Sequence, residues 1–275
     1  MKRRNFRYII VYMRSVFLLC ISVLYLACSG CAQRYYNVAT EKQEIYFYST
    51  EKEVRIGQSL SQAVEEKFKL DDDPLSQQHI DAIGQKLALV NERKDLRYSF
   101  KLLQEDKVNA VALPGGFIYI FKELWDKVKE SDDAIAAVLA HEIAHVSARH
   151  SIKRLQSSMG YGALSVLVVA ARGIDARSRT NAIIGINELL LSYSREDELE
   201  ADALAVKYLV NAGYDPGAII EVLEILQQSE RERPIRPLYV ATHPYITERM
   251  RTVRERIDKG NIGFDDYINT LGNTN

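Results

Sequence analysis

Cysteine is scarce in this chain, and all three cysteines lie near the N-terminus, at positions 20, 28 and 31 of 275 residues. The rest of the chain therefore has no disulfide to form and no thiol to oxidise. Long apolar runs are also absent. The apolar run at residues 16–27 has about a dozen residues, whereas a transmembrane helix needs about 20.

Acidic residues are absent before Glu41, and the first 14 residues hold five basic residues (Lys2, Arg3, Arg4, Arg7 and Arg14). Without these five, 31 Lys and Arg residues stand against 37 Asp and Glu residues, which gives a net charge of −6. Such a surface has none of the basic excess that binds nucleic acid. We therefore expect no nucleic-acid partner.

The basic start followed by a short apolar run is typical of a secretory signal peptide. The run ends in Leu-Ala-Cys-Ser-Gly-Cys-Ala, which resembles a bacterial lipobox, in which a cysteine is acylated and becomes the first mature residue. Cys31 fits best because Ser29 and Gly30 precede it, and Cys28 is the alternative. An ordinary cleaved signal or an uncleaved anchor also stays open. We expect residues 1–31 to be a lipoprotein signal peptide, and the mature chain to begin at a lipid-bearing Cys31.

The most specific motif is H-E-x-x-H at residues 141–145, inside a small-residue, apolar stretch that favours helix from about 132 to 150. Residues four apart lie on one helix face, so His141 and His145 can each give a nitrogen to one Zn²⁺. Glu142 can then take the proton of a water that the metal activates. A surface coincidence and a polar core network are the alternatives. Metal binding is favoured because buried polar groups need partners.

A third ligand is expected because a catalytic zinc usually takes three protein ligands. The candidate segment is the acidic run at residues 196–202, which opens a second helical pattern. It holds two carboxylate pairs four residues apart, Glu196 with Glu200 and Glu198 with Asp202. Spacing alone does not choose between them, and most of these carboxylates could simply form a solvated first turn that the helix dipole favours.

These two segments together resemble the gluzincin metallopeptidase family that includes the CAAX prenyl endopeptidases, the HtpX-type proteases and the bacterial periplasmic lipoprotein proteases. The similarity runs over residues 41–257. Further matching motifs are Asn-Ala-Val-Ala-Leu-Pro-Gly-Gly at 109–116, Arg-His-Ser at 149–151, Ser-Arg at 194–195 and Thr-His-Pro at 242–244.

The resemblance implies roles for individual residues. His141, His145 and Glu198 would bind one zinc ion per subunit, and Glu142 would be the base. Asp202 would orient a ligand imidazole through its other nitrogen.

Three further residues receive expectations. The resemblance places Asn109 near the scissile carbonyl. His243 precedes Pro244 at the start of the last helix, where it could occupy the fourth metal position, donate a hydrogen bond to the oxyanion or only cap the helix. The oxyanion role is favoured. His150 lies nine residues after His141, so it is predicted to point off the zinc face and to play a structural part.

The expected fold is α+β and predominantly helical, a zincin-like gluzincin fold with a small sheet beside the active helix. Helical patterns cover residues 51–69 and 75–93, and the second breaks before Asn91. Strand-like runs follow at 98–103, 108–113 and 117–121, and the chain is helical thereafter. The expected divisions are a tether at 32–50, a metallopeptidase domain at 51–260 and a tail at 261–275.

The function that the resemblance implies is a zinc-dependent metalloendopeptidase that hydrolyses peptide bonds in protein substrates, in quality control of envelope proteins. It would face the periplasm from a lipid anchor, in the outer rather than the inner membrane. The strands before the active helix suit an extended polypeptide substrate. The alternatives are an envelope chaperone or assembly factor with little proteolysis, and a zinc hydrolase acting on non-peptide substrates.

Overall fold

The computed structural model describes residues 33–170, 176–191, 193–232 and 243–260. The signal segment with Cys31 and the tail at 261–275 lie outside these residues. Of the helices in the described ranges, none combines the length and the apolarity that crossing a membrane requires.

A small sheet occupies the segment that the sequence predicts to be a tether. Strands β1 (Gln33–Asn37) and β2 (Lys42–Tyr46) pair with each other, and most of this hairpin forms a compact unit separate from the rest of the chain. Its apolar side chains, such as Tyr36 and Ile45, are largely exposed.

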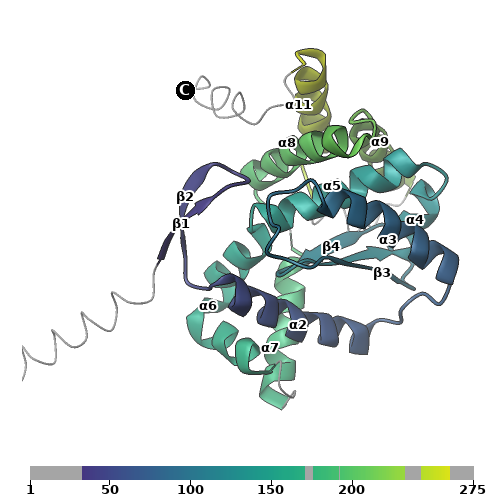
Figure 1. Cartoon of the computed structure of the whole chain (residues 1–275). Helices are drawn as coiled ribbons and strands as arrows, with labels where there is room; N and C mark the ends of the chain where they lie inside the picture. Colours follow the sequence, from purple (N-terminus) through teal and green to yellow (C-terminus); the bar gives the residue numbers. More distant parts are fainter. Residues whose placement is uncertain (1–32, 171–175, 192, 233–242, 261–275) are drawn as a thin grey trace, which may run out of the picture. The chain divides into compact units, whose positions relative to one another are not determined.

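The main unit is predominantly helical, as expected (Figure 1). Its helices are α2 (Thr50–Lys67), α3 (Pro74–Ala88), α4 (Lys122–Val128), α5 (Asp132–Ser147), α6 (His150–Ala170), α7 (Ala176–Leu189), α8 (Arg195–Ala212), α9 (Ala218–Glu232) and α11 (Ile246–Asp258). The helical pattern at 75–93, which is predicted to break before Asn91, ends slightly earlier, at Ala88. The Asn91 side chain bonds both Ala88 O and Arg93 N–H, which offers the backbone an alternative to further helix.

Three strands form the central sheet, in the order β3 (Ser99–Leu103), β5 (Phe117–Phe121) and β4 (Ala110–Leu113). This confirms the three expected strands. β5 lies between the other two strands and runs parallel to β3 and antiparallel to β4. Because β4 pairs with β5 alone in this order, it is an edge strand. The turn between β4 and β5 requires glycine at position 115, where φ is +80° and a Cβ would lie 2.8 Å from Val54 Cα.

The sheet separates two apolar cores. Ile118 and Ile120 of β5 pack with side chains of α3, α5 and α8, whereas Tyr119 and Phe121 pack with side chains of α2, α6 and α7. This alternation is the two-residue period of a strand that is buried on both faces. Figure 1 shows α5 on one face of the sheet, with α8 beyond it.

The helix α5 is buried on every side from residue 134 to residue 147. Its many alanines leave room for α8 to pack along it. Ser131 caps it by accepting the Ala134 N–H at 3.2 Å, and Asp132 and Asp133 complement the positive end of its dipole. A polar side chain on this helix is therefore held in a dry, rigid environment.

Candidate metal centre and active site

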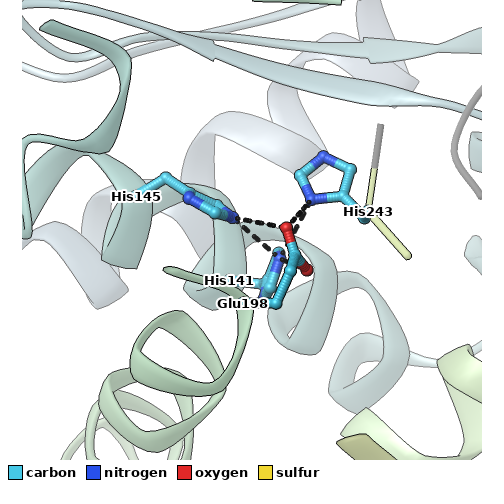
Figure 2. A group of neighbouring side chains, drawn as sticks. All are labelled: His141, His145, Glu198 and His243. Carbon is cyan, nitrogen blue, oxygen red and sulfur yellow. Dashed lines mark hydrogen bonds and ion pairs between the residues drawn. The ribbon is translucent and has the colours of Figure 1, made fainter. Parts of the chain in front are cut away.

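Three elements bring the candidate ligands together. His141 and His145 lie one turn apart on α5, Glu198 is in the first turn of α8, and His243 precedes α11. All four side chains are buried, and Figure 2 shows them converging on one point.

The distances between their polar atoms match a tetrahedral metal site. His141 Nε2 lies 3.1 Å from His145 Nε2 and 3.3 Å from His243 Nδ1. Glu198 Oε1 lies 3.0 Å from His243 Nδ1 and 3.6 Å from His145 Nε2. Ligands about 2.0–2.1 Å from a tetrahedral zinc are separated from one another by about 3.3 Å.

The chemistry of these atoms also fits a cation. Three imidazole nitrogens and a carboxylate face one another, and neutral imidazoles that present lone pairs to a common centre repel one another unless a positive charge lies between them. The described residues therefore form a buried group that can hold a metal ion.

Glu142 points into the same region. Within the described part of the chain no hydrogen bond reaches its Oε1, and His243 Nε2 is 3.7 Å from that atom. Burial raises the pKa of the Glu142 carboxyl above its ordinary value. A buried carboxylate with a free oxygen and a raised pKa is suited to accept a proton near neutral pH.

Arg249 on α11 was not found by sequence reasoning, and it is one of the largest fully buried side chains. Its guanidinium binds both oxygens of Asp202, at 2.7 and 2.8 Å, and lies 2.7 Å from Glu198 Oε2. Burial raises the pKa of Glu198, but Arg249 and His243 outweigh it and hold the pKa well below the ordinary value. Glu198 is therefore kept ionised, as a metal ligand must be.

The two histidines of the motif differ in their electrostatic surroundings. Burial and Arg249 lower the pKa of His141, but hydrogen bonds to Asp202 and Glu198 outweigh them and raise it to about 9. His141 Nδ1 lies 3.0 Å from Asp202 Oδ1. Burial and the neighbouring His141 lower the pKa of His145 well below its ordinary value. In the metal-free site, His141 thus holds a proton that a metal must displace.

The two carboxylate pairs differ in how far their side chains are exposed and in what they face. The Glu196 side chain is 67% exposed, whereas Glu198 and Asp202 are buried beside the histidines. Glu200 is buried too, but it faces His150, with its Oε2 3.1 Å from His150 Nε2. The pair that the resemblance selects is therefore the pair at the site.

His150 and Tyr193 surround His145. The sequence predicts that His150 points off the zinc face and plays a structural part. Its Nδ1 lies 2.8 Å from His145 Nδ1, the ring nitrogen of His145 that faces away from the other candidate ligands. Tyr193, which the sequence did not single out, stacks on the His145 ring with centroids 4.1 Å apart. The Arg-His-Ser motif at 149–151 was the available signal for His150, and no motif pointed to the ring packing of Tyr193.

Asn109 is buried immediately before β4, and its carbonyl oxygen accepts the Phe121 N–H at 2.9 Å. Antiparallel pairing alternates, so Ala110 and Ala112 direct their main-chain groups away from β5. Ser151 Oγ donates to the Ala112 oxygen at 2.7 Å. The role of Asn109 near a scissile carbonyl stays a prediction.

The profile of Peptidase family M48 matches residues 74–257, which is most of the chain. The chain belongs to this family. The resemblance to zinc metallopeptidases that the motifs indicate is thereby confirmed, as is the predominantly helical α+β zincin-like fold.

Several curated proteins are similar to this M48 peptidase. The beta-barrel assembly-enhancing protease of Escherichia coli K12 is 26% identical over 215 residues, which cover 75% of this chain and 44% of that protein. The mitochondrial metalloendopeptidase OMA1 of Saccharomyces cerevisiae is 32% identical over 157 residues, 56% of this chain and 44% of its own length. The metalloprotease LoiP of Escherichia coli K12 is 28% identical over 177 residues, 64% of this chain and 69% of that protein. The matched region thus covers less than half of the first two relatives.

Proposed function

We propose that this M48 peptidase is a zinc-dependent metalloendopeptidase that hydrolyses peptide bonds in protein substrates. The observation that carries the proposal is the convergence of His141, His145 and Glu198 at tetrahedral spacing beside the free carboxylate oxygen of Glu142. Among the residues that the structure describes, this is the group that combines a possible cation site with an adjacent base.

In this proposal His141, His145 and Glu198 hold one zinc ion per subunit, and Asp202 orients His141 through Nδ1. Zinc, when bound, would polarise the scissile carbonyl and lower the pKa of a water towards about 7. Glu142 takes the proton of the attacking water and passes it to the leaving amine.

His243 would close the site at rest. Its Nδ1 lies where the fourth ligand of a tetrahedral set belongs, 3.0 Å from Glu198 Oε1 and 3.3 Å from His141 Nε2. This position supports a blocking role better than the oxyanion role that the sequence favoured. The imidazole must then move before a water and a substrate carbonyl can share the site. Once displaced, its N–H could still donate a hydrogen bond to the oxyanion, as Asn109 could.

The edge strand β4 would hold the substrate. Ala110 directs its N–H and C=O away from β5, so an extended peptide could pair with it as an added strand. The carbonyl of Ala112 already accepts a bond from Ser151, which limits the pairing to the part of β4 near Asn109. Main-chain pairing of this kind favours polypeptides over small non-peptide substrates.

The cell envelope is the proposed location, and removal of misfolded envelope proteins the proposed role. The support is the similarity to two Escherichia coli proteins, one of them named for enhancing beta-barrel assembly, together with the lipobox-like sequence around Cys31. We propose that a lipid anchor holds the chain on the periplasmic side of the membrane.

Cys31→Ala should abolish partitioning with membranes, whereas Cys28→Ala should not. Mass spectrometry showing acylation of Cys28 would overturn this assignment.

The catalytic proposal is tested on a soluble form beginning at Ala32, by metal analysis and casein cleavage before and after removal of the metal. We expect one zinc per chain, loss of cleavage on chelation and recovery when zinc is added back. Cleavage that survives complete removal of the metal would contradict a zinc mechanism. A folded, zinc-loaded protein that binds casein without cutting it would instead favour a chaperone or assembly factor.

A further inference from the structure

His141 and His145 each have a second ring nitrogen that faces away from the metal position. The two histidines differ in the group that this nitrogen contacts. His141 Nδ1 meets a carboxylate directly, 3.0 Å from Asp202 Oδ1. His145 Nδ1 meets another imidazole, 2.8 Å from His150 Nδ1. His150 Nε2 in turn lies 3.1 Å from Glu200 Oε2.

The direction of these bonds follows from the metal position. His145 presents Nε2 to the other ligands, so a metal needs the lone pair of that nitrogen, and the proton of the neutral ring must sit on Nδ1. His145 Nδ1–H then donates to His150 Nδ1, which must carry a lone pair. The proton of His150 is therefore on Nε2, from which it donates to Glu200. Only this set of tautomers makes both bonds and leaves His145 Nε2 open.

We propose that His150 and Glu200 form a relay that fixes the tautomer and the ring orientation of His145 for metal binding. His150 is thus a positioning residue that acts through a ligand. The inference rests on the proposed assignment of His145 as a zinc ligand. Groups that hydrogen-bond the other ring nitrogen of a histidine ligand usually contribute 10–100-fold to metal affinity.

The backbone is built to bring His150 to this place. His150 follows His145 by five residues, and in a continuous helix it would point about 140° away from it. Arg149 breaks the helix with a left-handed φ of +60°, a conformation that is unfavourable for a residue with a side chain. Its guanidinium is held in the interior, with Nε 3.3 Å from Glu53 Oε2 and Nη2 donating to Thr50. The turn at Arg149 therefore swings His150 back against His145.

The other groups around His145 and His150 are compatible with these bond directions. Tyr193 stacks on the His145 ring, which limits tilting but does not select a tautomer. His150 and Glu200 are buried, and Asp197 Oδ1 lies 3.4 Å from His150 Nε2 as a second carboxylate on the same nitrogen. Both carboxylates lie beside Nε2 and not beside Nδ1, so they favour the same tautomer. In a purely structural network, the hydrogen bonds between His145, His150 and Glu200 could run in either direction.

The test compares the His150→Leu and His150→Asn variants of the whole chain. Leucine fills the space without an acceptor, whereas the asparagine oxygen can lie near the position of Nδ1 and accept from His145. We expect zinc affinity, measured by competition with a fluorescent chelator, to fall 10–100-fold in His150→Leu and to recover largely in His150→Asn. Both substitutions remove the Nε2–H that Glu200 accepts, so both should lower the melting temperature of the metal-free protein to a similar extent. A purely structural role would lower zinc affinity alike in the two variants, whereas the relay predicts a loss in His150→Leu alone. His79→Leu is the control, because His79 pairs with Asp132 at 2.8 Å on the surface.

A spectroscopic measurement tests the bond directions independently of these variants. Two-bond ¹⁵N–¹H correlation spectra of the zinc-loaded wild type should show a neutral His150 with its proton on Nε2. A proton on Nδ1 would overturn the relay, because that nitrogen could not then accept. If His150→Leu does not fold, Glu200→Leu replaces it, with Glu200→Gln as the conservative partner that keeps an acceptor oxygen.

The outcomes separate the relay from the proposed function. A wild type that binds no zinc would refute the proposed function and the relay with it. A wild type that binds zinc tightly, with His150→Leu within about threefold of it, would refute the relay alone.

Discussion

Arg249 is the buried cation on which the charge balance of the metal-free site depends, so its replacement by methionine should have a large effect. Its guanidinium neutralises Asp202 through two bonds and Glu198 through a contact of 2.7 Å, and all three side chains are buried. Removing one partner of a buried ion pair costs about 3–5 kcal/mol, because the remaining charge is left uncompensated. For a domain of this size that corresponds to a melting temperature lower by about 6–20 °C.

Zinc should reduce this deficit, because a bound divalent cation supplies positive charge to the same carboxylates. The assay is thermal unfolding of wild type and Arg249→Met, each metal-free and zinc-saturated. Arg195→Met is the matched control. Arg195 also binds a carboxylate through two contacts, with Glu248, but its side chain is 41% exposed, and such surface pairs contribute about 0–1 kcal/mol. A metal-free Arg249→Met protein that melts within about 2 °C of wild type would refute the reasoning.

Three further predictions concern the metal. Glu198→Ala should lose most of its zinc, because His141, His145 and the displaceable His243 imidazole hold metal poorly by themselves. Glu196 is exposed, so Glu196→Ala should keep the wild-type zinc content. The reverse pattern would show that the wrong carboxylate was chosen. His141 has a pKa of about 9, so protons compete with zinc below that pH, and apparent affinity should rise roughly tenfold per pH unit from pH 7 to 9. A flat titration over that range would exclude His141 as the competing site. His243→Ala should raise casein cleavage at saturating zinc, because the blocking imidazole is gone. A much lower rate would mean that His243 mainly stabilises the transition state.

The fold was predictable where the pattern had a physical period. The apolar runs at β3 and β5 and the small-residue stretch of α5 were recognisable because local propensity and burial agree there. The break before Asn91 was predictable, and α3 ends two residues before that point, at Ala88, where the Asn91 side chain bonds the backbone. The hairpin at residues 33–46 was missed because its sequence is polar and aromatic without a clear alternation.

The candidate site was predictable as far as its ligands have fixed spacing. His141 and His145 follow from one turn of helix, but the choice of Glu198 needed a family resemblance, because two carboxylate pairs have equal spacing. Arg249 was missed, and the contact of His150 with His145 was not predicted, for a different reason. Arg249 reaches the site from a helix about 50 residues beyond Glu198, and His150 reaches it through a left-handed turn, so neither follows from a helical period.

The most direct test of the central claim is the turnover of Glu142→Gln at full zinc occupancy. Glutamine is nearly isosteric with glutamate but cannot accept the proton of the attacking water, so metal and fold should be retained. We expect one zinc per chain, an unchanged circular dichroism spectrum and casein cleavage reduced by about 10²–10⁴-fold. A variant that binds one zinc and cleaves casein at the wild-type rate would contradict the assignment of Glu142 as the base, and with it the proposed mechanism.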